Sequence, residues 1–117
     1  MGDYGMSVTW GDPKPGREAK ALELFMESVA LNDKAVADGR IERWDTIFFE
    51  PTGSPPAGAT RFYGTQEQIE AFIAAEDTQN IIQRAGLLLE NFGFRRFVTG
   101  DALAQIVGAY GQLVSTL

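Results

Sequence analysis

The chain has 117 residues, with ten Lys and Arg against sixteen Asp and Glu, so its formal net charge is −6, and 44% of its residues are hydrophobic. That length supports one hydrophobic core, so we expect residues 1–117 to form a single domain. Cysteine and histidine are both absent. This excludes disulfides, thiolate or imidazole metal sites and Ser-His-Asp catalysis, and we expect neither a metal nor a cofactor.

The acidic balance also limits the partners. Binding to phosphate relies on cationic side chains, so a protein of this charge gains no general attraction to nucleic acid or to an anionic membrane. The first residues carry no basic segment followed by an apolar run, and no stretch of about 18 apolar residues occurs. We therefore expect a cytoplasmic protein that binds neither nucleic acid nor a membrane.

Residues 7–10 alternate small polar with large apolar side chains, which predicts a strand with one buried face. After a turn rich in Pro and Gly, a helix is predicted that ends at Asp38-Gly39. Its expected apolar stripe is Leu22, Phe25, Met26, Val29 and Val36. Asn32 falls on the same stripe, and a buried amide needs partners. We expect a hydrogen bond to neighbouring backbone in preference to projection into a cavity.

Residues 41–50 predict a strand with apolar side chains on both faces, and hence a central one, and residues 59–63 predict its antiparallel neighbour. Thr65 and Gln68 have the spacing of a capping box at the start of a helix. That helix carries Ile69, Phe72 and Ile73, and a second helical segment follows Asp77 through Ile81, Ile82 and Ala85.

Residues 87–98 are ambiguous, because three leucines could finish the preceding helix while Phe92, Phe94, Arg96 and Val98 alternate like a strand. We place a fourth strand there. The last element, about residues 101–117, is an amphipathic helix with Asp101 as its expected cap. Gly108 and Gly111 inside it would permit close packing against another helix, which suits dimerisation, or would fray it.

The order β-α-β-β-α-β with an added helix predicts an α+β ferredoxin-like fold with a four-stranded antiparallel sheet. In element order, length and aromatic strands, the chain resembles the dimeric α/β-barrel proteins. That group includes cofactor-free monooxygenases, haem-degrading enzymes and muconolactone isomerases, and the resemblance implies a homodimer with two sheets packed face to face. Several of its oxygenases use a histidine beside Asn and Trp. This sequence has no histidine, so no catalytic residue is carried over.

Two helices cover one face of such a sheet, so a second copy or the C-terminal helix must cover the other, and we favour a homodimer. Alternation separates Trp44, Thr46 and Phe48 from Arg43, Asp45, Ile47 and Phe49. It also separates Phe62 from Arg61 and Tyr63. The pattern leaves open which set faces the helices.

Two clusters are candidate sites. Arg43, Arg61, Arg95, Tyr63 and Asp45 could bind a small anionic or phenolic molecule at one end of an apolar cleft. The favoured alternative is cross-strand ion pairing, worth about 0.2–1 kcal/mol per pair. Trp10 and Trp44 could stack a planar ligand, although large aromatic residues on strands more often belong to a core or an interface.

Three classes of function remain open from the sequence. We favour a dimer that binds a small organic molecule in a cleft. The alternatives are a cofactor-free isomerase or monooxygenase like those of the group named above, and a non-catalytic assembly or interaction module.

Overall fold

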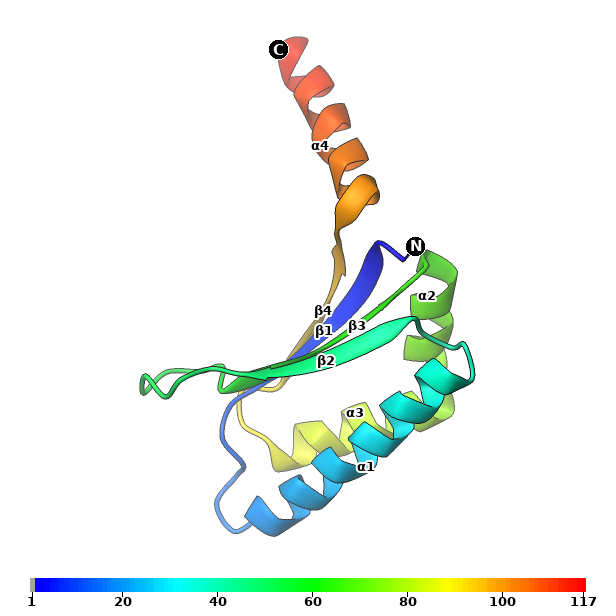
Figure 1. Ribbon diagram of the computed structural model, residues 1–117. Helices are drawn as coiled ribbons and strands as arrows, with labels where there is room; N and C mark the ends of the chain where they lie inside the picture. Colours follow the sequence, from blue (N-terminus) through cyan, green and yellow to red (C-terminus); the bar gives the residue numbers. More distant parts are fainter. Residues whose placement is uncertain (1) are drawn as a thin grey trace.

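A computed structural model describes residues 2–117. Along this part of the chain the elements are β1 (Tyr4–Trp10), α1 (Glu18–Ala37), β2 (Arg43–Phe48), β3 (Gly58–Gly64), α2 (Gln66–Ala74), α3 (Glu76–Leu88), β4 (Gly93–Val98) and α4 (Gly100–Ser115). The four strands form one antiparallel sheet in the order β2-β3-β1-β4, and α1, α2 and α3 all lie on one side of it (Figure 1). This is the ferredoxin-like arrangement that the order of elements predicts.

The expectation that β2 is central is wrong, since β1 and β3 occupy the centre and β2 is an edge strand. The prediction assumed that apolar side chains on both faces of this strand meant that both faces were covered. However, Phe48 and Phe49 are exposed at the end of β2, so part of its apolar surface is open to solvent. The antiparallel pairing of β2 with β3 is confirmed, with Trp44 opposite Phe62 and Asp45 opposite Arg61.

The core lies between the sheet and the helices. Met6 of β1, Phe62 of β3 and Phe72 of α2 are buried there, with the two phenyl rings 5.3 Å apart. Burying each such side chain contributes about 1.5–3 kcal/mol. The same alternation that points Met6 and Phe62 at the helices turns Arg61 and Tyr63 to the other side of the sheet, which fixes the faces that the sequence left open.

The buried side of α1 differs from the predicted stripe. Its buried residues are Ala21, Leu24, Asn32 and Ala35, whereas Leu22 and Met26 are 63% and 58% exposed. Small side chains at both ends of the buried line let the helix approach its neighbours closely, and a pattern based on large apolar residues gives such positions little weight.

The junctions of α2 and α3 follow the sequence. Thr65 Oγ1 accepts a hydrogen bond from Gln68 N, and Gln68 Oε1 accepts one from Thr65 N, so the capping box is confirmed. Extended backbone at Ala75 separates α2 from α3. Of the three leucines at positions 87–89, the first two belong to α3, which ends at Leu88. The last follows the helix, and β4 begins at Gly93.

α4 continues beyond β4 and points away from the rest of the chain (Figure 1), and none of its residues is buried. It begins at Gly100, and Asp3 Oδ2 accepts a hydrogen bond from Ala102 N in its first turn. The expected cap at Asp101 is therefore wrong, because the capping carboxylate comes from the other end of the chain. Within residues 2–117, no helix is both long and apolar enough to span a membrane.

Candidate functional site

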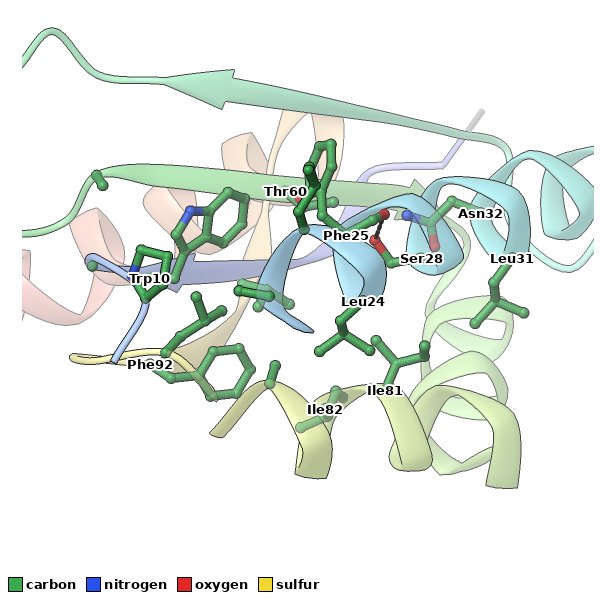
Figure 2. A pocket seen from close by; sticks show the side chains of 18 of the residues that line it. Trp10, Leu24, Phe25, Ser28, Leu31, Asn32, Thr60, Ile81, Ile82 and Phe92 are labelled. Atoms are coloured by element: carbon green, nitrogen blue, oxygen red, sulfur yellow. Dashed lines mark hydrogen bonds between the residues drawn. The ribbon is translucent and has the colours of Figure 1, made fainter. Parts of the chain in front are cut away.

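A cavity of about 410 Å³ lies between the helix-covered face of the sheet and helices α1 and α3. Figure 2 shows that its walls come from three places, with Trp10 and Thr60 on strands, Phe25 and Ser28 on α1, and Ile82 on α3. Most of the lining side chains are apolar. This composition is typical of sites for small organic molecules, in which a few polar groups fix the orientation of the ligand.

The exposed lining residues mark where the cavity opens. These are Asp12, Glu18, Leu22 and Phe48, which lie at the N-terminal end of α1 and at the ends of β1 and β2. Nearby, backbone hydrogen bonds join the loop after β1 to the loop before β4, from Gly11 N to Glu90 O at 2.7 Å and from Glu90 N to Asp12 O at 2.9 Å. The opening therefore has a fixed rim that carries two carboxylates.

Asn32 lies at the inner end of the cavity, in the second half of α1 (Figure 2). Its side chain is 2% exposed, and Nδ2 has no hydrogen-bond partner among residues 2–117. The expected bond from this amide to neighbouring backbone is therefore wrong at Nδ2. Leaving such a donor unpaired costs about 1–3 kcal/mol, so the site retains a polar group at the expense of stability.

Two hydroxyl groups in the cavity wall already have partners. Ser28, one helical turn before Asn32 on the same face of α1, donates from Oγ to Phe25 O at 2.6 Å. The hydroxyls of Thr60 and Thr46 are 3.0 Å apart and hydrogen-bonded across β3 and β2. Among the residues that the structure describes, the buried donor without a partner in the cavity wall is therefore Nδ2 of Asn32.

Aromatic rings gather toward the other end of the cavity. The ring of Trp10 lies 6.4 Å from that of Phe25 and 6.3 Å from that of Phe48, both in edge-to-face geometry. Phe25 and Phe48 complete the cluster at 6.1 Å. Such contacts hold rings in defined orientations and offer flat apolar surface to a ligand. The cavity therefore has an aromatic outer part and a polar inner end.

Two ion pairs fix the helices that form its walls. Arg84 of α3 makes two hydrogen bonds to the carboxylate of Glu27 on α1, at 2.8 and 2.7 Å. Arg40, just before β2, makes two to Asp77 in the first turn of α3, at 2.9 and 3.0 Å. These hydrogen bonds hold the pKa values of Glu27 and Asp77 below their ordinary range. Both carboxylates are therefore charged at neutral pH.

Four of the seven residues expected at a binding site meet on the face of the sheet opposite the helices, which we call the open face. Asp45 and Arg61 form a bidentate pair at 2.8 and 2.9 Å, and this hydrogen bonding raises the pKa of Arg61. The Arg43 guanidinium lies 3.5 Å from the centre of the Tyr63 ring. The cross-strand pairing that the sequence favoured is present at Asp45 and Arg61.

The three remaining candidates lie outside this group. Trp10 lines the cavity, whereas Trp44 lies on the helix side and donates from Nε1 to Asp33 Oδ1 at 2.9 Å. Arg95 of β4 and Arg61 of β3 both pair with Ser7, so Arg95 is on the open face too, but β1 lies between it and Arg61. Within residues 2–117, no three acidic side chains come together in a group that could hold a metal ion. The sequence signal for the inner end of the cavity was Asn32, a polar residue on an apolar helix stripe.

Solved structures share this architecture at low sequence identity. A dimeric protein of unknown function with a ferredoxin-like fold from Bacteroides fragilis matches with a TM-score of 0.58 and 8% identity, over 81% of this chain and 94% of that chain. A protein of unknown function from Nitrosomonas europaea matches with a TM-score of 0.60 and 17% identity, over 84% and 89%. A Deinococcus radiodurans protein, whose proposed activity is that of an antibiotic biosynthesis monooxygenase, matches with a TM-score of 0.57 and 9% identity, over 84% and 92%.

No family model and no curated protein matches the chain. At identities below 20%, the likeness to solved structures establishes the fold and carries no residue roles. The chain therefore has the ferredoxin-like fold that its order of elements predicts.

Proposed function

We propose that this protein binds a small, mostly apolar organic molecule in the cavity between the sheet and helices α1 and α3. One observation carries the proposal: an apolar space of about 410 Å³ ends at Asn32, a buried amide with an unpaired donor. Protein interiors are close-packed, and buried polar groups are almost always hydrogen-bonded. A bound ligand would both fill the apolar space and give the amide nitrogen a hydrogen-bond partner.

Binding is favoured over chemistry by the placement of the ionisable groups. Among the described residues that line the cavity, the titratable side chains are the carboxylates of Asp12 and Glu18, and both are exposed at the opening. A general acid or base must reach the reacting atoms. A molecule held at the inner end beside Asn32 meets amide, hydroxyl and hydrocarbon groups only.

We propose in addition that the protein acts as a homodimer, in which a second copy covers the open face and the apolar side of α4. Six large apolar residues of α4 are between 44% and 67% exposed, and Leu117, just after the helix, is 95% exposed. An apolar surface of this kind is typical of an interface. The Bacteroides fragilis structure with this fold is described as dimeric, which supports the proposal. The paired Asp45 and Arg61 would then lie between the two sheets.

The cavity is tested with Nile red, a neutral dye whose emission rises in apolar surroundings, and two matched variants of the full chain. Ala21→Leu places three further carbon atoms at the cavity wall, while Ala19→Leu makes the same change at an exposed position of the same helix. We expect the first variant to bind the dye more weakly than the wild type and the second to bind it equally. Equal binding by all three proteins would contradict the proposal.

Native mass spectrometry of the freshly purified protein gives an independent check. We expect a mass of two chains together with a retained small molecule, and a smaller retained fraction in Ala21→Leu than in Ala19→Leu. Circular dichroism confirms that both variants are folded before the comparison is made.

A further inference from the structure

We infer that the molecule bound in this cavity is uncharged or cationic and presents an oxygen acceptor, such as a ketone or amide carbonyl, to Nδ2 of Asn32. The inference rests on the proposed function and specifies the chemical class of its ligand. Three features of the cavity lead to it: the free donor, the charge at the opening and the direction in which polarity changes along the cavity.

The free donor determines the hydrogen-bonding group. Nδ2 of Asn32 is buried in the wall and has no partner among residues 2–117. The nearest hydroxyl along the helix, Ser28 Oγ, already donates to Phe25 O. An amide nitrogen can only donate, so the matching ligand atom is an acceptor. A hydrocarbon ligand would fill the same space and leave the donor unsatisfied.

The charge at the opening determines the sign of the ligand. Asp12 and Glu18 are the charged side chains among the described lining residues, and neither Lys nor Arg contributes to that wall. Transfer of a carboxylate into an apolar site without a cationic partner is strongly unfavourable, and the two rim carboxylates would repel it. Arg43 and Arg61 lie on the opposite face of the sheet.

The change in polarity along the cavity gives the orientation of the ligand. Trp10, Phe25 and Phe48 form its aromatic outer part, whereas Asn32 lies at its inner end (Figure 2). A flat apolar molecule would therefore enter with its carbonyl first and leave its hydrocarbon part against the rings. The ligand class is an uncharged or cationic aromatic or polycyclic ketone, amide or related carbonyl compound.

The experiment uses three probes of matched shape: 2-acetylnaphthalene, 2-ethylnaphthalene and 2-naphthoate. Their affinities for the full-length wild-type protein are measured by isothermal titration calorimetry. We expect the ketone to bind about tenfold more tightly than the hydrocarbon, the ratio that corresponds to one satisfied hydrogen bond, and the carboxylate to bind most weakly. Because these comparisons use the wild type, they do not depend on whether any variant folds.

Two variants then assign the preference to its residue. Asn32→Leu removes the donor and keeps the number of side-chain non-hydrogen atoms, and we expect it to bind ketone and hydrocarbon equally. Asn80→Leu makes the same change at an exposed position of α3, and we expect it to keep the tenfold ratio. Equal wild-type affinities for ketone and hydrocarbon would overturn the inference while leaving the cavity as a binding site. Tightest binding of the carboxylate would also overturn it. Failure of all three probes, together with unchanged Nile red binding in Ala21→Leu, would reject the proposed function itself.

Discussion

Replacing Asn32 with leucine is expected to make the ligand-free protein more stable. The amide nitrogen is buried without a partner, and such a group costs about 1–3 kcal/mol. Leucine has the same number of side-chain non-hydrogen atoms, carries no unsatisfied donor and adds a few tenths of a kcal/mol in helix propensity. We therefore expect the free energy of unfolding to rise by about 1–3 kcal/mol. For a chain of this size, the melting temperature should rise by roughly 4 °C per kcal/mol.

Urea unfolding followed by circular dichroism measures this change, with melting temperature as a second observable. Asn80→Leu is the matched control, because it replaces an exposed helical amide whose Oδ1 accepts one hydrogen bond from Arg84. That variant should change stability by less than about 0.5 kcal/mol. A loss of more than 1 kcal/mol in Asn32→Leu would refute the reasoning, because it would mean that the amide makes bonds in the folded protein.

Further predictions concern the open face, the ion pairs and α4. Arg61→Ala should leave the affinity of the cavity for 2-acetylnaphthalene unchanged within twofold in a calorimetric titration, because the side chain lies on the opposite face of the sheet. Asp77→Asn should reduce the loss of stability in acid. The pKa of Asp77 lies below its ordinary value of 3.8, so the carboxylate contributes its full stabilisation above pH 3.8. That contribution disappears as the pH falls through the lowered pKa. Urea unfolding at pH 7 and pH 3 measures the difference, and because Asp77 and Arg40 are partly exposed, the contribution at pH 7 should be below about 1 kcal/mol. Ile106→Lys on the apolar side of α4 should convert dimer to monomer in size-exclusion chromatography with light scattering, whereas Gln105→Lys should not; a dimer that survives Ile106→Lys would exclude α4 from the interface.

Much of the fold could be predicted from local sequence signals. The Thr65–Gln68 capping box, the end of α1 at Asp38 and the antiparallel pairing of β2 with β3 depend on neighbouring residues or strict alternation, and all three are confirmed. The place of β2 in the sheet and the buried side of α1 were predicted wrongly. Both depend on which elements pack together, and small residues such as Ala21 give little sign of this in a hydrophobic pattern.

The site could be predicted only in part. Alternation correctly grouped Arg43, Asp45, Arg61 and Tyr63 on one face, yet it could not show that the cavity lies on the other. Asn32 stood out as a polar residue on an apolar stripe, but whether its donor is paired depends on side chains from β1, β3 and α3. Long-range packing of this kind has no counterpart in residue spacing.

The attachment of α4 has a consequence for how two copies would meet. Thr99 N donates to Asp3 O at 2.7 Å, and the carboxylate of Asp3 accepts from Ala102 N, so the root of this helix is tied to the strand that begins the sheet. Its direction is thereby set in the isolated subunit. A rigid projection loses less conformational entropy on association than a swinging tail would, and it permits encounter rates typical of preformed surfaces. Loosening that tie, for example with Asp3→Ala, would slow assembly even though the residue itself need never touch the second copy.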